Sequence, residues 1–253
     1  MTDNTEYDLH GYEPGHDDTP LVLLEKAGGF YECPRDADGK RIGPLVGYAG
    51  KYGSDELQYV GDVYANFGKL ERWPHLVESI VDTTDLIALY EYPIDVICGV
   101  PEGGRTLGQE VARQLRSAFV YPVKSIVKPA TETHRQEEAL VFSREEPWAG
   151  HRVWISEDVV NNMTNTEETI AGIEAFGATV EGICCFLNRS ETNDHEYTTR
   201  SGRTIPIVYA VRKTYSQWQQ DDPAVALDMQ SGNFALKPKK EWSRLMSAMN
   251  AAR

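Results

Sequence analysis

The chain has 253 residues, of which 41% are hydrophobic, so it can bury a substantial core within one elaborated domain. Its 39 acidic residues outnumber its 25 Lys and Arg residues, and the formal charge of −14 disfavours general attraction to nucleic acid or to a membrane surface. No apolar run approaches the roughly 20 residues of a membrane-spanning helix, and the amino terminus lacks the features of a signal peptide, so we expect a cytoplasmic protein.

The amino-terminal part of the chain mixes helical and hairpin-like patterns. Residues 19–28 predict a short helix, residues 30–68 are rich in glycine and tyrosine and alternate like hairpin strands, and residues 72–90 predict a second helix. The pattern changes at Ile94, where strand-like and helix-like segments begin to alternate.

Short apolar runs after Ile94 predict strands, and apolar residues at helical spacing follow several of them. The predicted strands are residues 95–100, 119–123, 153–155, 180–187 and 205–211. Repeated strand and helix units predict an α/β fold with an open, mostly parallel sheet flanked by helices. Ligands of such sheets bind at the carboxyl ends of the strands.

Two other segments and the cysteines complete the survey of the chain. The charged segment from Thr131 to Gly150 predicts a mobile loop that could close over a substrate, and residues 240–249 predict a final helix. The cysteines have neither metal-ligand nor redox spacing, and we expect buried thiols at Cys33, Cys98, Cys184 and Cys185.

Two adjacent acids, Glu157 and Asp158, follow the strand predicted at 153–155, and a polar loop then opens a helix. Strand side chains alternate between the faces of a sheet, so the two carboxylates can reach ribose hydroxyls from two directions. Amides of the loop can face an anion at the start of the helix. Loop side chains that can donate hydrogen bonds are Asn161, Asn162, Thr164, Asn165 and Thr166. The alternative is that an acid at this place only caps the helix.

This order of strand, acids, loop and helix resembles the ribose-5-phosphate signature of type I phosphoribosyltransferases. The resemblance implies that Glu157 and Asp158 hold the ribose hydroxyls and stabilise positive charge at the anomeric carbon, while residues 161–166 bind the 5′-phosphate. The family usually has glycine at the positions of Met163 and Thr164, and small residues at those of Asn161 and Asn162. Met163 must therefore either tolerate the backbone angles or shift the loop.

A second loop resembles the pyrophosphate loop of the same family. It contains Glu102, Gly103, Gly104 and Arg105, and it follows the strand predicted at 95–100. Exposed amides and the Arg105 guanidinium would suit a diphosphate, although a tight strand-to-helix turn is the alternative. Both loops follow strand ends, which makes a shared cleft plausible.

Basic residues extend the resemblance to orotate phosphoribosyltransferases. Lys124 and Lys128 lead into the charged segment that contains His134. In those enzymes a basic pair at this place leads into a flexible catalytic loop, commonly contributed across a dimer interface. This implies a catalytic role for Lys128 and substrate contacts for Lys124 and His134. Arg189 resembles an arginine that contacts the base and would pair with the orotate carboxylate, with a structural salt bridge as the alternative.

The resemblance covers residues 94–212 in motif order and implies a single domain over residues 1–253. Residues 1–93 would form a hood and amino-terminal helices, residues 94–212 the core sheet, and residues 213–253 a carboxy-terminal extension.

The implied reaction transfers ribose 5-phosphate from phosphoribosyl diphosphate to a nitrogenous base, with orotate as first choice. Mg²⁺ would bridge diphosphate and ribose oxygens, and the protein would be a homodimer. Two interpretations remain beside this one. The base is a purine or uracil, or the protein is a non-catalytic regulator that binds phosphoribosyl diphosphate or a nucleotide. The altered loop from Asn161 to Thr164 favours the regulator, whereas the absence of a helix-turn-helix pattern and a basic face opposes it.

Overall fold

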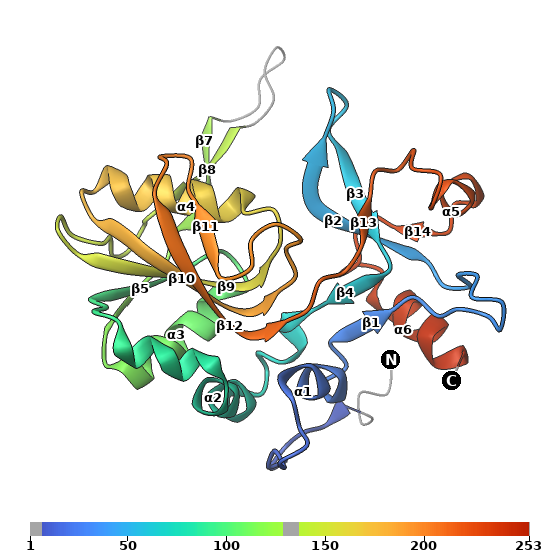
Figure 1. Cartoon of the computed structure of the whole chain (residues 1–253), viewed down its shortest axis with the longest axis horizontal. Helices are drawn as coiled ribbons and strands as arrows, with labels where there is room; N and C mark the ends of the chain where they lie inside the picture. Colours follow the sequence, from blue (N-terminus) through green and yellow to red (C-terminus); the bar gives the residue numbers. More distant parts are fainter. Residues whose placement is uncertain (1–6, 129–136, 253) are drawn as a thin grey trace. The chain divides into compact units, whose positions relative to one another are not determined.

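The computed structural model of the chain describes residues 7–128 and 137–252, which divide into two compact units (Figure 1). The terminal unit contains both ends of the chain, up to Arg72 and from Thr214 on, and the central unit contains Trp73–Lys213. Residues 73–93, which the sequence assigned to the amino-terminal segment, therefore pack with the central sheet. The predicted carboxy-terminal extension packs with the amino-terminal segment.

A six-stranded sheet forms the central unit, in the order β11-β12-β10-β9-β5-β6. All neighbouring strands are parallel except β11 and β12, which are antiparallel. The strands are β5 (Val96–Gly99), β6 (Ala118–Val120), β9 (Arg152–Val160), β10 (Thr179–Asn188), β11 (Glu196–Thr198) and β12 (Thr204–Arg212). The predicted α/β fold with a mostly parallel sheet is confirmed.

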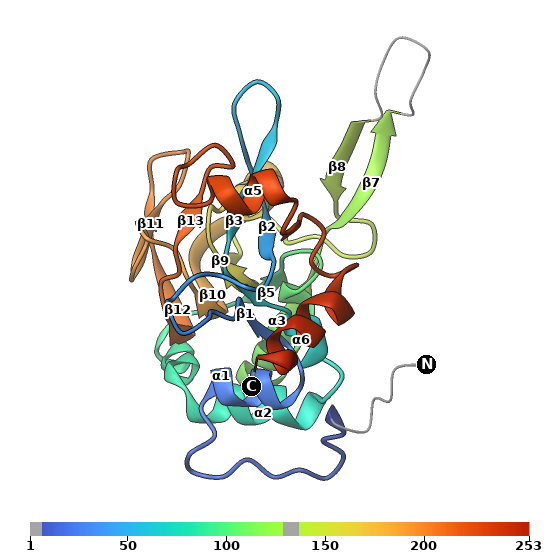
Figure 2. The ribbon, with the colours of Figure 1, turned by 90° about the vertical axis from the view of Figure 1, so that its right-hand side faces the viewer.

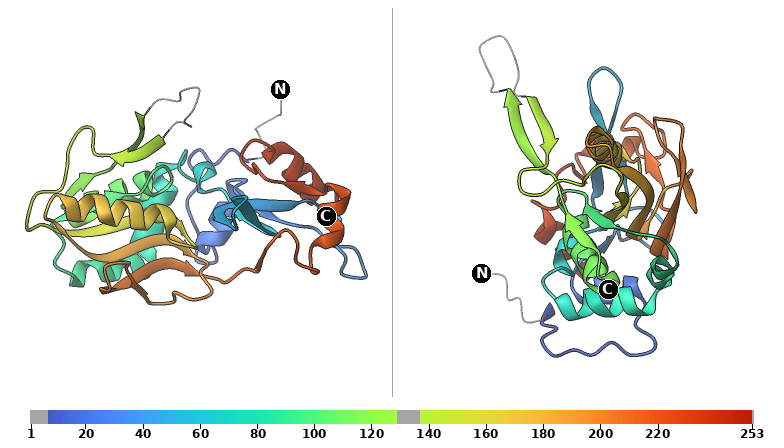
Figure 3. Two further views of the ribbon diagram at one scale, coloured as in Figure 1. Left: turned by 90° about the horizontal axis from the view of Figure 1, so that it is seen from above. Right: turned by 90° about the vertical axis from the view of Figure 1, so that its left-hand side faces the viewer.

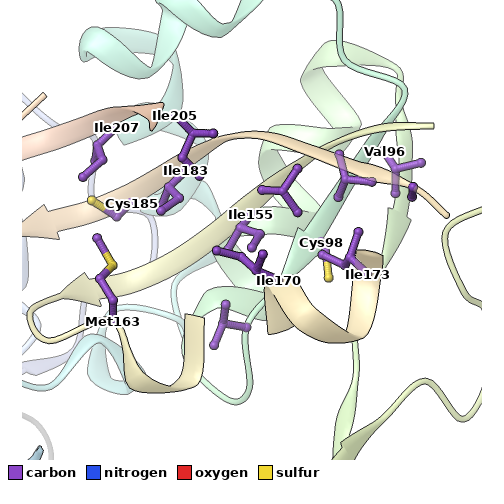
Figure 4. Close-up of a cluster of buried hydrophobic side chains, with 14 of the residues drawn as sticks. Val96, Cys98, Ile155, Met163, Ile170, Ile173, Ile183, Cys185, Ile205 and Ile207 are labelled. Atoms are coloured by element: carbon purple, nitrogen blue, oxygen red, sulfur yellow. The ribbon is translucent and has the colours of Figure 1, made fainter. Parts of the chain in front are cut away.

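Helices cover both faces of this sheet. They are α2 (Pro74–Thr83), the 3₁₀ helix η3 (Asp85–Glu91), α3 (Gly104–Leu115) and α4 (Thr164–Ala175). Figures 1 and 3 show α4 on one face and α2 and α3 on the other. Successive residues of β9 serve opposite faces: Ile155 belongs to the buried cluster of Ile170 and Ile173 from α4 (Figure 4), whereas Ser156 lies against Gly108 of α3.

A separate two-stranded ribbon projects from the chain between β6 and β9. In it β7 (Val123–Lys128) pairs antiparallel with β8 (Glu137–Val141). The loop predicted from Thr131 to Gly150 is wrong over residues 137–141, where β8 forms, and its residues 131–136 lie outside the described part of the chain. The charged sequence of β8 lacks the hydrophobic periodicity of a strand, and pairing with β7 supplies its hydrogen bonds.

The terminal unit is built around a four-stranded sheet in the order β13-β3-β2-β14 and a β1–β4 pair, whose strands are labelled in Figure 1 and partly again in Figure 2. Its elements are α1 (Pro20–Lys26), β1 (Phe30–Glu32), β2 (Leu45–Tyr52), β3 (Leu57–Gly61), β4 (Val63–Ala65), η2 (Phe67–Lys69), β13 (Gln217–Trp218), α5 (Ala226–Ser231), β14 (Phe234–Ala235) and α6 (Trp242–Ala251). The helices predicted at 19–28 and 240–249 and the β2–β3 hairpin are confirmed.

Two further sequence expectations concern burial and length. All four cysteines are buried free thiols, as predicted. Within residues 7–128 and 137–252, each helix is too short or too polar to cross a membrane.

Candidate functional site

The two predicted loops meet at one edge of the central sheet, because they follow adjacent parallel strands. Gly99 at the end of β5 pairs with Ser156 of β9, and the backbone N–H of Val100 donates to the Ser156 carbonyl over 2.9 Å. Beyond this point β5 leads into the glycine turn at 102–105, whereas β9 continues through the acidic pair to Val160. The structure thus brings together the two motifs for which the sequence made a shared cleft plausible.

The glycine turn packs directly against the end of β9. A Cβ atom on Gly103 would lie 2.0 Å from Oδ2 of Asp158, and one on Gly104 would lie 2.1 Å from the Ser156 carbonyl oxygen. Both distances are far below van der Waals contact, so only glycine allows this approach. The Asp158 carboxylate consequently lies against the backbone of the turn.

Glu157 is buried, with 8% of its surface exposed, and its Oε2 accepts a hydrogen bond from the Thr166 hydroxyl over 3.2 Å. Burial and then the neighbouring Asp158 carboxylate raise the pKa of Glu157 well above its usual 4.5. The buried position of this carboxyl therefore favours its protonated form in the free protein. Positive charge arriving nearby would favour its ionised form.

Asp158 is half-buried, and its Oδ1 accepts a hydrogen bond from the backbone N–H of Val159 over 2.8 Å. Its Oδ2 is the oxygen nearest Gly103. One carboxylate thus stands at the strand end beside the glycine turn, while the other is committed to the start of α4 through Thr166. The two acids have different surroundings and can take different roles.

The loop between β9 and α4 turns at Met163, whose φ and ψ are 59° and 13°. Met163 tolerates this left-handed conformation because its side chain is buried, with 4% exposed, in the cluster that contains Cys185 and Ile207 (Figure 4). A left-handed conformation costs a non-glycine residue roughly 1–2 kcal/mol, whereas burying a methionine contributes about 1.5–3 kcal/mol. Burial therefore offsets the backbone cost.

The first turn of α4 is shaped by polar contacts on either side of Met163. Oδ1 of Asn162 accepts hydrogen bonds from the Thr164 backbone N–H over 3.4 Å and from its hydroxyl over 3.3 Å. The Met163 carbonyl accepts from the N–H of Glu167 over 2.8 Å. N–H groups of a first helical turn have no acceptor within the helix, so those of Asn165 and Thr166 can face an anion. The Thr166 hydroxyl itself is directed to Glu157.

Arg105 lies in the first turn of α3, directly after the glycine turn. Its guanidinium stacks 4.6 Å from the centre of the Tyr121 ring and donates to the Pro122 carbonyl over 3.3 Å. Within the part of the chain that the structure describes, its buried Nε has no hydrogen-bond partner. Glu102, the first residue of the predicted loop, is exposed. Tyr121, which stacks with Arg105, was missed by the sequence reasoning, because the strand predicted at 119–123 included it, whereas β6 ends at Val120.

The other predicted basic residues occupy different places. Lys124 and Lys128 are exposed on β7, and His134 lies outside the described residues. Arg189 follows β10, has 5% of its surface exposed, and donates its backbone N–H to the Val160 carbonyl over 3.0 Å. It thus lies at the same sheet edge as the acidic pair.

Asn188 is a further residue that sequence reasoning missed. It is buried at the end of β10, where its Nδ2 donates to the carbonyls of Asn193 and Asp194 over 2.9 and 2.8 Å. Its Oδ1 accepts from the backbone N–H of Ser190 over 3.1 Å. The side chain therefore organises the loop that begins with Arg189. The sequence feature that could have identified Asn188 is an amide side chain at the end of a long apolar run.

No group of three or more His, Cys, Asp or Glu residues that could hold a metal ion occurs in residues 7–128 and 137–252. Mg²⁺ commonly binds through one or two carboxylates together with substrate phosphates and water. The donor set of Glu157 and Asp158 fits an ion of this kind that is shared with a phosphorylated substrate.

Comparisons with known proteins cover the same region of the chain. Residues 69–217 match the family model described as phosphoribosyl transferase domain. The chain is 27% identical over 128 residues to an orotate phosphoribosyltransferase of Wolinella succinogenes, a match that covers 50% of this chain and 57% of the relative. It is 27% identical over 132 residues to an orotate phosphoribosyltransferase of Caldanaerobacter subterraneus subsp. tengcongensis, covering 51% of this chain and 63% of the relative. The chain thus spans less than two thirds of either relative.

Among solved structures, the UMP synthase of Leishmania donovani aligns with 94% of this chain and 43% of its own chain, at 13% identity and a TM-score of 0.49. The orotate phosphoribosyltransferase of Aeropyrum pernix aligns with 75% of this chain and 91% of its own, at 17% identity and a TM-score of 0.45.

Proposed function

The chain belongs to the phosphoribosyl transferase domain family, and from this premise we propose that it transfers ribose 5-phosphate from phosphoribosyl diphosphate to orotate. The observation that carries the proposal is the contact between Asp158 and the glycine turn at Gly103. A sugar that carries a diphosphate on its anomeric carbon needs a ribose-binding carboxylate and a diphosphate-binding turn side by side. The position of Asp158 beside the glycine turn, toward the carboxyl ends of adjacent strands, supports this arrangement.

The 5′-phosphate would bind at the start of α4. The amides of Asn165 and Thr166 and the positive end of the helix dipole favour an anion there. Side-chain donors would come from Asn161, Asn162 and Thr164.

The diphosphate would bind at the turn formed by Glu102, Gly103 and Gly104, where glycine leaves the backbone accessible. Arg105 supplies the nearest guanidinium, and its unpartnered Nε supports a role in anion binding. Lys128 would neutralise the leaving pyrophosphate, with Lys124 and His134 as further contacts, as the family resemblance implies.

In the chemical step, the bond from the anomeric carbon to the diphosphate oxygen breaks and a bond to the base nitrogen forms. The anomeric carbon carries positive charge between these events, and the Asp158 carboxylate beside the turn would stabilise it. The same charge would favour ionisation of Glu157, which Thr166 holds in place. Together with substrate oxygens, the two acids would hold Mg²⁺, which supplies neutralisation of the diphosphate charge.

Orotate is the proposed base because both curated relatives named above are orotate phosphoribosyltransferases, and Arg189 would pair with its carboxylate. The contact requires the buried Arg189 to reach the base from the end of β10. A purine or uracil remains the second candidate for the base. A homodimer and a cytoplasmic location remain predictions.

The test is a turnover assay with phosphoribosyl diphosphate, Mg²⁺ and each of five bases in turn: orotate, uracil, adenine, guanine and hypoxanthine. Product nucleotides are identified by mass spectrometry. Conversion of orotate to orotidine 5′-phosphate is expected. Turnover of another base alone would remove orotate from the proposal. Calorimetric binding of phosphoribosyl diphosphate without turnover of any base would favour the non-catalytic regulator.

A further inference from the structure

Met163 stands in the loop that would bind the 5′-phosphate, at a position where its backbone is left-handed. Three non-glycine residues have a positive φ within residues 7–128 and 137–252: Glu56, Arg116 and Met163. Glu56 and Arg116 are exposed, whereas Met163 is buried with 4% of its surface exposed. Of these three residues, Met163 alone combines a left-handed backbone with a side chain that is buried in the core.

We propose that Met163 is a positioning residue, whose buried side chain holds the phosphate loop in its binding conformation. The proposal rests on the proposed function, because it takes the 5′-phosphate as the ligand of this loop. Glycine at this position would leave the backbone free to adopt several conformations. Methionine replaces that freedom with a fixed attachment.

The attachment joins the loop to strands other than the one that delivers it. In Figure 4 the Met163 side chain rises from the loop toward Cys185 of β10 and Ile207 of β12. The loop itself enters from β9 and leaves through α4. Met163 is therefore held between β9 and α4 along the chain and packs in the same cluster as β10 and β12. This packing fixes the backbone between Asn162 and Thr164.

The backbone atoms of Met163 already take part in the turn that presents the amides. Its carbonyl accepts the Glu167 N–H, and Oδ1 of Asn162 accepts the Thr164 N–H. Since the side chain is buried in the core, it does not project from the loop toward a phosphate bound at the first turn of α4. The loop can therefore bind a phosphate although it has no glycine at this position.

Loss of the buried Met163 side chain should lower the fraction of protein whose loop is in the binding conformation, and so weaken phosphate binding. A ligand that binds only one loop conformation has its affinity reduced in proportion to the fraction of protein in that conformation, so a competent fraction of about a tenth raises the apparent Kd about tenfold. The expected signature is a higher Kd and KM for phosphoribosyl diphosphate with little change in kcat.

The experiment compares Met163→Gly and Met163→Leu with the parent protein. Calorimetry gives the Kd for ribose 5-phosphate and for phosphoribosyl diphosphate with Mg²⁺, scanning calorimetry gives Tm, and steady-state assays give KM and kcat. Met163→Gly should raise both Kd values about tenfold. Met163→Leu keeps a buried apolar side chain and should therefore have the Kd values of the parent. Ile173→Ala is the matched control, because Ile173 is buried in the same cluster but lies in the last turn of α4, at the end of the helix that is remote from the loop.

Ile173→Ala should lower Tm and leave both Kd values unchanged. Equal Kd values for Met163→Gly and the parent would overturn the positioning role and leave Met163 as a core residue only, with the proposed function intact. If Met163→Gly does not fold, Met163→Ala supplies the same comparison, because it removes the anchor and keeps a side chain at the left-handed position. Failure of the parent itself to bind either sugar phosphate would overturn the proposed function and this inference together.

Discussion

Replacing Gly103 by alanine adds one methyl group where the glycine turn meets the acidic pair. The new carbon would lie 2.0 Å from Oδ2, 2.2 Å from Cγ and 2.8 Å from Cβ of Asp158. Because non-bonded carbon atoms prefer a separation of about 3.5–4.0 Å, the Asp158 side chain must move by on the order of 1 Å. The backbone of Gly103, with φ of −66° and ψ of −32°, accepts alanine without strain.

The expected effect is a loss of activity with little loss of stability. A misplacement of about 1 Å in a catalytic group can cost 10²-fold in rate, which corresponds to about 2.7 kcal/mol of transition-state stabilisation. Alanine also reduces the entropy of the unfolded chain, which contributes roughly 0.4–1 kcal/mol to stability and opposes any loss from the displaced side chain. The kcat/KM for phosphoribosyl diphosphate should therefore fall about 10²-fold, while Tm should change little.

The assay measures orotate consumption beside a thermal melt of the same preparation. Gly172→Ala is the control, because a Cβ there would meet only Phe142, at an ordinary 3.5 Å, within the body of α4. It should keep full activity and gain roughly 0.5–1 kcal/mol from helix propensity. A parent-like kcat/KM for Gly103→Ala would refute the reasoning that this glycine positions Asp158.

Three other predictions test the acids and the thiols. Asp158→Asn should lower kcat about 10²–10³-fold with little change in Tm, and equal losses of both would indicate a structural cap. Because burial raises the pKa of Glu157 in the folded protein above the usual 4.5, the folded state binds this proton more tightly than the unfolded chain does, and the free energy of unfolding falls as pH rises from about 4.5 toward the raised pKa. Glu157→Gln has no titrating carboxyl at this position, so the Tm of the variant minus that of the parent should increase as pH rises, and parallel pH profiles would contradict this. Burial raises the pKa of Cys184 to about 12 and that of the other thiols as well, so a thiol reagent at neutral pH should modify the native protein only after denaturant is added. Reaction before denaturation would show an accessible thiol.

The sheet was predictable because buried parallel strands are apolar runs that can be read locally. The run at 180–187 became β10 with one residue added at each end. The strand predicted at 153–155 continues as β9 through both acids to Val160, because Cys185 and Leu187 of β10 pair with Glu157 and Val159. Polar residues inside a strand are invisible to hydrophobic periodicity when a neighbouring strand supplies the pairing.

The sequence predicted which motifs lie near each other at the site, but it did not predict the side-chain contacts between them. Parallel neighbouring strands bring their carboxyl ends together, so the acidic pair and the glycine turn were expected at one edge. Three contacts depend on tertiary packing that no local pattern encodes. They are Arg105 on Tyr121, the Thr166 hydroxyl on Glu157, and Met163 in the core.

The terminal unit combines an amino-terminal and a carboxy-terminal segment of the chain, and this determines the order in which the two units can fold during synthesis. In that unit β14 pairs with β2, and the Trp242 indole donates to the Gly28 carbonyl over 3.0 Å. A ribosome delivers all of Trp73–Lys213 before either of these partners emerges. The nascent chain can therefore finish its central sheet while β2 has β3 as its only sheet neighbour among the described strands, and any truncation upstream of Phe234 would leave the edge of β2 that faces β14 unpaired.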